Sequence, residues 1–269
     1  MSTYFQNKVA VITGGSEGIG KSLVEALLAM DVKVATCARN QDRLYDLMLQ
    51  NPGKPLHTMV ADVSKESDCK QFIESTIKTF GGIDVLINNA GISMKALVKD
   101  TTLDTLRNVM DINFWGTVYC TKYALPHIIK RKGDIVGVSS IAGYRGLPGR
   151  SGYSASKFAM NGWLEALRTE LLDSGVNVMW VAPGFTSSNI RIDALNPKAK
   201  QNGYSSMDEN KMMSSDKCAS LILKAIGRKK RTLILTLTGW RTVFVNRLLP
   251  NMADRLIRKF FFKNGDLVK

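Results

Sequence analysis

The clearest chemical signal in the sequence is the pentapeptide YSASK, which places Tyr153 and Lys157 four residues apart. Around it, the stretch SGYSASKFAMNGWLEALRTEL carries apolar residues at helical spacing. Residues four apart on a helix share one face, so the phenol and the amine can point into the same cleft. A neighbouring ammonium favours ionisation of a phenol, whose ordinary pKa is about 10, and makes it a usable general acid or base. An isolated pair of this kind is also typical of an amphipathic helix, so the interpretation depends on other motifs.

A second signal is the glycine-rich segment TGGSEGIG, which follows an apolar run and precedes a helical one. Glycine permits a tight turn and lets the backbone approach a pyrophosphate at a helix N-terminus, where free N–H groups favour negative charge. The segment therefore predicts a dinucleotide-binding loop. Its candidate contacts are Gly14, Ser16, Gly18, Ile19 and Gly20.

The residue at the end of the second predicted strand favours one nicotinamide cofactor over the other. An acid at this place would bond the ribose 2′-hydroxyl, whereas a cation would accept a 2′-phosphate. The sequence reads CARN, with Ala38 where an acid would stand, followed by Arg39. NADP(H) is therefore favoured over NAD(H), although Glu17 in the glycine loop does not supply a second cation. The alternative is that Arg39 is a surface charge at the start of a helix.

These residues need strands and helices to position them, and the sequence alternates between the two. Short apolar runs, separated by segments with helical spacing, predict parallel strands covered on both faces by helices. The predicted strands are KVAVIT (8–13), VKVATC (32–37), HTMVADV (57–63), IDVLINNAG (83–91), GDIVGVSS (133–140), VNVMWVAPG (176–184) and TLILTLTG (232–239). A long helix is predicted over 103–131. Right-handed crossovers make this a doubly wound open sheet, whose ligands bind beyond the carboxyl ends of the strands.

Length and composition are consistent with one large α/β domain. The chain has 269 residues, 45% of them hydrophobic, and no uncharged apolar run long enough to span a bilayer. No secretion signal is recognised at the start, and a cytoplasmic location is predicted. The four cysteines are far apart and are expected to be small core residues: Cys37, Cys69, Cys120 and Cys218.

The motifs together resemble the short-chain dehydrogenase/reductase family. The resemblance covers about residues 7–190 and rests on a set of motifs in the family's order and spacing. These are TGGSEGIG, NNAG (88–91), Asn113 in DINFWG, Ser140 thirteen residues before Tyr153, YSASK and PG (183–184). It implies a Rossmann-type, doubly wound three-layer sandwich with a seven-stranded parallel sheet. It also implies hydride transfer between nicotinamide and a carbonyl or alcohol.

The resemblance implies a catalytic set of four residues. Tyr153 would protonate the carbonyl oxygen during reduction, and Ser140 would hold that oxygen by a hydrogen bond. Lys157 would lower the pKa of Tyr153 and bind the nicotinamide ribose. Asn113 would keep a water molecule in a proton relay to Lys157. No metal ion is implied, because Tyr153 and Ser140 polarise the carbonyl.

Further cofactor contacts are implied by the same resemblance. Asp62 and Val63 would contact the adenine, and Asn89, Ala90 and Gly91 would shape the floor of the cofactor site.

At the nicotinamide, Pro183 and Gly184 would flank the ring. Ser188 stands where the family often has a threonine that holds the carboxamide. The hydroxyl is retained, so the same contact is expected.

The polar segment 189–215 lacks a sustained period and follows a strand end, so it is predicted to be a substrate lid, with an ordinary surface insertion as the alternative. Residues 1–239 are predicted to form a single catalytic domain. Residues 240–269 form a basic extension whose apolar residues recur at helical spacing, which predicts two amphipathic helices. Such helices suit either an anionic membrane surface or packing on the same chain or a second subunit.

The predicted function is NADP(H)-dependent oxidoreduction of a ketone or secondary alcohol. The extension is similar to that of members acting on lipid-like or steroid-like ketones, so an apolar substrate is expected. The alternative is an NADP-binding sensor or scaffold without turnover. The net charge is +14, but no nucleic-acid motif accompanies it and no nucleic-acid partner is expected. The family commonly forms dimers or tetramers, so a homo-oligomer is expected.

Overall fold

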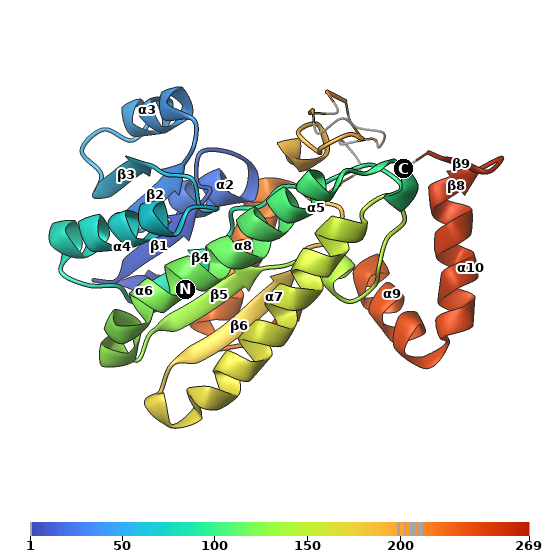
Figure 1. Cartoon of the computed structure of the whole chain (residues 1–269). Helices are drawn as coiled ribbons and strands as arrows, with labels where there is room; N and C mark the ends of the chain where they lie inside the picture. Colours follow the sequence, from blue (N-terminus) through green and yellow to red (C-terminus); the bar gives the residue numbers. More distant parts are fainter. Residues whose placement is uncertain (1, 198–199, 202, 205–207, 209–211, 269) are drawn as a thin grey trace.

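Figure 1 shows the fold as a computed structural model of the whole chain. The structure describes residues 2–197, 200–201, 203–204, 208 and 212–268. Parts of the predicted lid therefore lie outside the described residues.

Seven strands form one parallel sheet in the order β3-β2-β1-β4-β5-β6-β7. The strands are β1 (Val9–Thr13), β2 (Lys33–Ala38), β3 (Leu56–Val60), β4 (Val85–Asn88), β5 (Asp134–Val138), β6 (Asn177–Ala182) and β7 (Thr232–Ile234). The order reverses between β1 and β4, where a doubly wound sheet opens a crevice for ligands. The predicted Rossmann-type fold is confirmed.

Helices cover both faces of the sheet and make a three-layer sandwich (Figure 1). One layer contains α2 (Gly18–Leu28) and α8 (Ser215–Gly227), and the other contains α4 (Glu66–Phe80), α6 (Gly116–Arg131) and α7 (Ser151–Glu170). Alternate residues of one strand point to opposite faces. In β1, Ala10 and Ile12 pack in the core on the α2 side, whereas Val11 packs in the core on the α4 side.

The remaining elements connect the strands and end the chain. They are α1 (Ser2–Phe5), α3 (Gln41–Leu49), η1 (Val98–Asp100), α5 (Leu103–Met110), η2 (Asp111–Trp115), η3 (Ile141–Gly143), η4 (Leu172–Ser174), η5 (Asn189–Arg191), α9 (Leu237–Leu248), α10 (Pro250–Phe261), β8 (Phe262–Lys263) and β9 (Asp266–Leu267). The long helix predicted over 103–131 is interrupted by a π-helical segment, η2, between α5 and α6. Such segments are frequent at functional sites, and this one contains Asn113.

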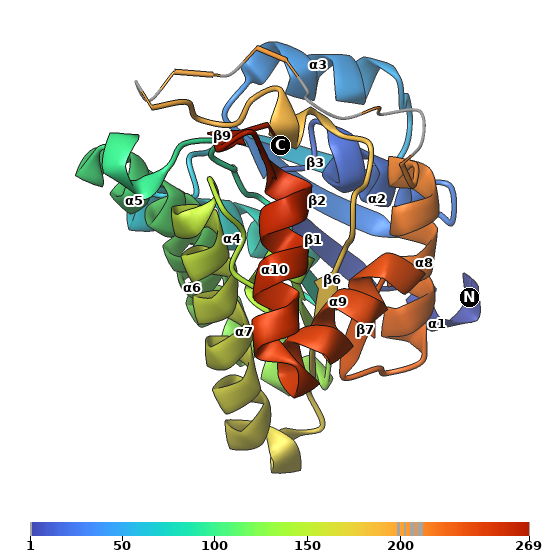
Figure 2. The same ribbon diagram turned by 90° about the vertical axis from the view of Figure 1, so that its right-hand side faces the viewer.

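The end of the sheet differs from the prediction. The last strand was predicted over 232–239, but β7 ends at Ile234 and α9 begins at Leu237. Thr236 caps this helix, since its hydroxyl accepts a hydrogen bond from Gly239 N at 3.1 Å. A capping hydroxyl stabilises a helix start, which explains why these residues leave the sheet. Figure 2 shows α9 and α10 in front of the sheet, with α10 upright across the view.

The four cysteines are buried free thiols, as predicted. Among the described residues, no helix combines the length and the apolar character that crossing a membrane requires.

Candidate active site

A large cavity of about 1130 Å³ lies at the carboxyl ends of the strands. Its walls come from the segments after β1, β2, β4, β5 and β6, together with η5, α9 and α10. All but one of the predicted site residues line it. Those that do are Gly14, Ser16, Gly18, Ile19, Gly20, Arg39, Asp62, Val63, Asn89, Ala90, Gly91, Ser140, Tyr153, Lys157, Pro183, Gly184 and Ser188. The exception is Asn113.

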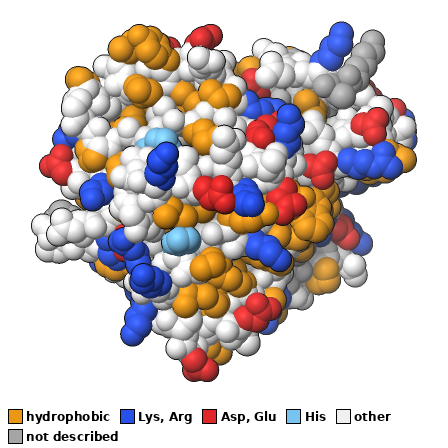
Figure 3. Space-filling view, turned by 60° about the vertical axis from the view of Figure 1, so that its left-hand side comes forward, with side chains coloured by type: hydrophobic (Ala, Val, Ile, Leu, Met, Phe, Trp, Pro, Cys, Tyr) orange, Lys and Arg blue, Asp and Glu red, His pale blue; other side chains and the backbone are white. Residues whose placement is uncertain are grey.

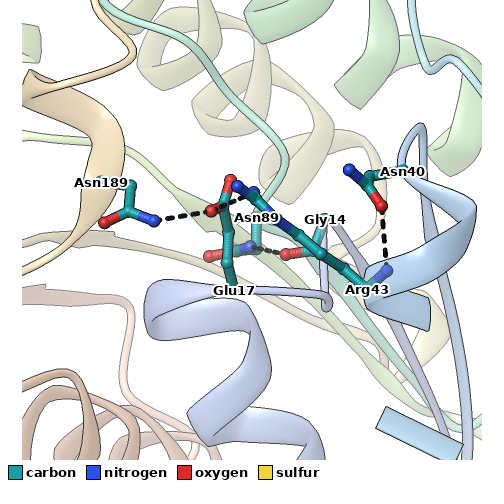
Figure 4. A network of polar contacts seen from close by, with 6 residues as sticks. All are labelled: Gly14, Glu17, Asn40, Arg43, Asn89 and Asn189. Carbon is teal, nitrogen blue, oxygen red and sulfur yellow. Dashed lines mark hydrogen bonds and ion pairs between the residues drawn. The ribbon is translucent and has the colours of Figure 1, made fainter. Parts of the chain in front are cut away.

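The glycine loop is held in a shape that only glycine allows at two positions. Gly14 has a φ of +69°, in the left-handed region. A Cβ on Gly20 would lie 2.1 Å from Gly14 O, so the loop closes on itself without side chains. Asn89 fixes this arrangement, because its Nδ2 donates to Thr13 O at 3.0 Å and to Gly14 O at 3.0 Å. The bond to Gly14 is drawn in Figure 4. The result is a bare backbone surface at the start of α2, the kind of surface that binds a pyrophosphate.

Tyr153 and Lys157 share one face of α7, as predicted. Lys157 Nζ lies 5.8 Å from the centroid of the Tyr153 ring and donates to Val138 O at 2.9 Å. Both side chains are buried. Burial lowers the pKa of Lys157 to about 7.

The pKa of Tyr153 is raised by burial, and hydrogen bonding with Ser140 opposes this rise. The positive charges of Arg150 and Arg191 oppose it too. The sequence motif predicts that electrostatic effect for Lys157 and assigns no role to either arginine. Arg150 stands three residues before Tyr153, a helical spacing that was available in the sequence as a signal.

Ser140 follows β5 and begins the short helix η3. Its hydroxyl accepts a hydrogen bond from Ala142 N at 3.1 Å. This bond fixes the side chain at the end of the strand, where it lines the cavity close to Tyr153.

Asn113 lies behind the cavity wall and is completely buried. Its Oδ1 accepts from Ile92 N at 2.8 Å, and its Nδ2 donates to Ile92 O at 3.0 Å and to Ser156 Oγ at 2.9 Å. A Cβ on Gly91 would lie 3.1 Å from Asn113 Oδ1 and 3.4 Å from Lys157 Nζ. Asn113 and Lys157 therefore approach the same glycine. The carboxamide of Asn113, however, already forms hydrogen bonds with Ile92 and Ser156.

Beside the glycine loop, the cavity holds a polar network that the sequence did not reveal (Figure 4). The Glu17 carboxylate forms an ion pair with Arg43 from α3 and accepts a hydrogen bond from Asn189 Nδ2 at 3.0 Å. Arg39 lines the same part of the cavity and is exposed. Arg43 stands four residues after Arg39, so a search for a second cation in the first turn of α3 would have found it.

The opposite part of the cavity is lined by α10. The contributing side chains are Leu256, Ile257, Phe260 and Phe261. Phe260 stacks on Phe185, with ring centroids 6.1 Å apart, and Phe261 is 2% exposed. The chain after β7 therefore returns to the cavity instead of leaving the domain.

Arg145 holds the extension in place. Its guanidinium bonds Asn246 Oδ1 at 2.8 Å and forms an ion pair with Asp254. Asn246 Nδ2 also donates to Tyr144 O at 3.0 Å. Of the alternatives left open for the extension, packing on the same chain is therefore observed for part of its surface.

The cavity, the glycine loop and the Tyr153–Lys157 pair define a nicotinamide-dependent oxidoreductase of the Rossmann type. The chain belongs to the short-chain dehydrogenase/reductase family, because the family model described as short chain dehydrogenase matches residues 8–198. The glycine surface, which added Cβ atoms would fill, fits the nicotinamide dinucleotide that this family uses.

Curated relatives match most of the chain. It is 32% identical over 264 residues to "Dehydrogenase/reductase SDR family member 7B" of Mus musculus, covering 94% of this chain and 81% of the relative. It is 35% identical over 267 residues to "11-beta-hydroxysteroid dehydrogenase-like 2" of Arabidopsis thaliana, covering 96% and 84%.

Solved structures share the fold. A short chain dehydrogenase/reductase from Burkholderia phymatum in complex with NAD superposes with a TM-score of 0.83 at 21% identity, covering 93% of this chain and 96% of that one. An alcohol dehydrogenase from the archaeon Thermococcus sibiricus, complexed with 5-hydroxy-NADP, has a TM-score of 0.71 at 25% identity, covering 85% and 95%. Structural neighbours thus bind either form of the cofactor, and the fold alone does not select one.

Proposed function

We propose that the protein is an NADP(H)-dependent oxidoreductase that interconverts a ketone and a secondary alcohol of apolar character. The observation that carries this proposal is that Tyr153, Ser140 and Lys157 line one cavity together with the glycine loop. A general acid, an oxygen-binding hydroxyl and a dinucleotide surface are the groups that this chemistry needs.

The roles of the side chains follow from their placement. The nicotinamide, when bound, supplies or accepts the hydride. Ser140 holds the substrate oxygen, and Tyr153 gives its phenolic proton to that oxygen during reduction or takes it back during oxidation. Lys157 lies beside Gly91 and binds the ribose on the cofactor side. Asn113 holds the backbone of Ile92, the residue after Gly91, through two hydrogen bonds. Its predicted role in a proton relay stays a proposal.

We also propose the other cofactor contacts that the family resemblance implies. Asp62 and Val63 line the cavity for the adenine, and Pro183, Gly184 and Ser188 line it for the nicotinamide end. A Cβ on Gly18 would lie 3.3 Å from the Ser188 Cβ, so Ser188 comes close to the glycine loop.

The preference for NADP(H) is supported by two cations, Arg39 and Arg43, where a 2′-phosphate would lie. Glu17 opposes the preference, because its carboxylate pairs with Arg43. We propose that a 2′-phosphate replaces the Glu17 carboxylate on Arg43.

An apolar substrate is supported by the α10 wall, where four apolar side chains face the cavity opposite the glycine loop. The described part of segment 189–215 adds Ile190 and Leu195 to the cavity lining, which supports its role as a lid. The printed name of the Arabidopsis relative points to a steroid-like substrate for that protein, and it agrees with an apolar ligand here.

The test is NADPH oxidation at 340 nm against ketones ranging from small diketones to steroids and long-chain keto lipids. Tyr153→Phe serves as the control variant, and NADPH binding is measured separately by fluorescence. Turnover that disappears in the variant while NADPH still binds supports the proposal. NADPH binding without turnover of any ketone would favour the sensor or scaffold instead.

Contact with an anionic membrane surface is proposed for the outer side of α9 and α10. Exposed apolar side chains are found there beside cations: Trp240, Phe244, Leu248 and Met252, with Arg241, Arg247 and Arg255. An exposed apolar surface flanked by cations is typical of interfacial helices. Trp240→Ala with Phe244→Ala should reduce co-sedimentation with phosphatidylserine vesicles, whereas Tyr45→Ala on α3, an aromatic of similar exposure, should not.

A homodimer or homotetramer and a cytoplasmic location stay predictions, as does the division into residues 1–239 and 240–269. On the side shown in Figure 3, hydrophobic side chains form patches between charges of both signs. Trp115 of η2, Ile129 of α6 and Phe158 of α7 are exposed, and we propose that subunits associate through these long helices. Sedimentation velocity of the full chain measures the oligomeric state.

A further inference from the structure

A buried arginine precedes Tyr153 by about one helical turn. Arg150 is 9% exposed, directly precedes α7, and lines the cavity. Its Nη1 donates to Ser93 Oγ at 3.2 Å, and Ser93 is itself 1% exposed. Within the described part of the chain, Arg150 forms no ion pair with a carboxylate. A guanidinium in such a place is costly unless an anion joins it.

A second arginine reinforces the positive charge. Arg191 is 7% exposed, lines the same cavity, and donates from Nη2 to Thr186 O at 2.6 Å. The pKa of Arg150 is lowered by burial first and then by the charge of Arg191, whereas Tyr153 acts to raise it. The two cations and the phenol therefore influence one another electrostatically, and an anion in the cavity would stabilise the Arg150 guanidinium.

The position of Arg150 separates it from the cofactor. Tyr153 and Lys157 lie on one face of α7, and Arg150 is the residue directly before that helix. All three line the cavity. The neighbouring chain runs beside them, with Gly91 next to Lys157 and Ser93 bonded to Arg150. Lys157 lies on the side of Tyr153 where the cofactor is proposed to bind. Arg150 therefore lies on the other side of Tyr153, where the part of the substrate beyond its carbonyl would extend. The pyrophosphate surface of the glycine loop is a separate part of the cavity.

We propose that Arg150, with Arg191 beside it, binds an oxyanion carried by the substrate near its reacting carbonyl, so that the preferred substrates are anionic ketones and the matching anionic alcohols. This inference rests on the proposed function and adds a substrate class to it. Carboxylate and phosphate both match the fork of a guanidinium, and both are included. The apolar wall of α10 receives the remainder of the molecule.

The first experiment compares turnover within matched pairs in the presence of NADPH. One arm uses medium-chain keto acids, with the carboxylate at increasing distance from the carbonyl, against their methyl esters. The other arm uses hydroxyketone phosphates against the free hydroxyketones. Since a charge-assisted hydrogen bond contributes about 10- to 100-fold, kcat/KM should favour the anionic member by that factor. The arm with the larger ratio identifies the anion.

Variants of Arg150 test whether this residue causes the preference in kcat/KM for the anionic member of each pair. Arg150→Gln should bring the anionic-to-neutral ratio of kcat/KM close to one. Any effect of the lost charge on Tyr153 is common to both members of a pair and cancels in the ratio. Arg150→Lys should restore part of the ratio. Arg107→Gln, a surface arginine paired with Asp104, is the matched control and should leave the ratio unchanged. Circular dichroism and NADPH binding establish that each variant is folded.

A second readout does not depend on turnover. Calorimetry with NADP⁺-saturated protein and a non-reducible carboxylate or phosphate analogue should show binding that Arg150→Gln loses. If neutral ketones are turned over and Arg150→Gln leaves the ratio unchanged, the inference is wrong and the proposed function stands. If no ketone is turned over, the proposed function fails, and calorimetry decides whether the anion site exists. Equal analogue binding by the wild type and Arg150→Gln, or no binding, overturns the inference.

Discussion

The two ends of the cavity are built in different ways. At the cofactor end, backbone atoms from the segments after β1 and β4 form the surface, and side chains are excluded: a Cβ on Gly20 would lie 2.1 Å from Gly14 O. At the substrate end, the surface is made of large side chains from α10, such as Phe260 stacked on Phe185. The cofactor end therefore depends on particular backbone conformations, whereas the substrate end depends only on apolar side chains of sufficient volume.

The largest effect is expected at the cofactor end. Gly20→Ala should raise the dissociation constant for NADPH by more than about 100-fold, because the new methyl group collides with Gly14 O and Asn89 Nδ2. Fluorescence titration measures it. Gly162→Ala in α7 is the matched control, since nothing lies within 4 Å of its added Cβ. Unchanged NADPH binding by Gly20→Ala would contradict the distinction between the two ends.

Lys157 lies between the two ends, and its burial predicts a pH effect on stability. Its pKa is about 7 in the folded protein and 10.5 when solvated, so between these values the unfolded chain holds the extra proton. The free energy of unfolding should therefore rise with pH from about 7 to 10.5, by up to ~1.4 kcal/mol per pH unit from this group.

Urea unfolding at several pH values, compared with Lys157→Met, isolates this contribution. The variant should show a smaller increase with pH, while all other titrating groups are common to both proteins. Equal slopes in the two proteins would show that Lys157 stays solvated in the fold.

A smaller effect is expected at the substrate end. Phe260→Ala should raise KM for an apolar ketone by about tenfold, because one aromatic side chain of the wall is lost, and should change the NADPH dissociation constant less than twofold. Steady-state kinetics and fluorescence titration measure the two values. Phe158→Ala on α7, exposed and outside the cavity lining, is the control. If Phe260→Ala changed the NADPH dissociation constant and left KM for the ketone unchanged, α10 would contribute to cofactor binding instead.

The smallest effect is expected for Glu17. Glu17→Gln removes the carboxylate that competes for Arg43, so NADPH should bind about fivefold more tightly and NADH with nearly unchanged affinity. Arg43→Gln should weaken NADPH binding instead. Equal effects of Glu17→Gln on both cofactors would show that its ion pair lies away from the 2′-phosphate.

The comparison of the two ends also explains what was predictable. The glycine loop, Tyr153 with Lys157, and Ser140 were found because each depends on residues close in sequence, whose spacing follows from a strand end or a helical turn. Arg150 was missed although it stands only three residues before Tyr153. It matters because its guanidinium is buried and, among the described residues, pairs with no carboxylate, and burial of a charge is not visible in residue spacing.

The Rossmann-type fold and the family could be predicted from the sequence alone, as could a set of site residues of which all but Asn113 line the cavity. It could do so because apolar periodicity and glycine spacing are local consequences of strand, turn and helix geometry. The three-dimensional structure was needed to show that α10 returns to line the cavity, that Asn113 lies behind the cavity wall, and that the Glu17 carboxylate contacts both Arg43 and Asn189. These contacts link segments far apart in the chain, and they depend on how helices and loops pack, which no short stretch of sequence specifies.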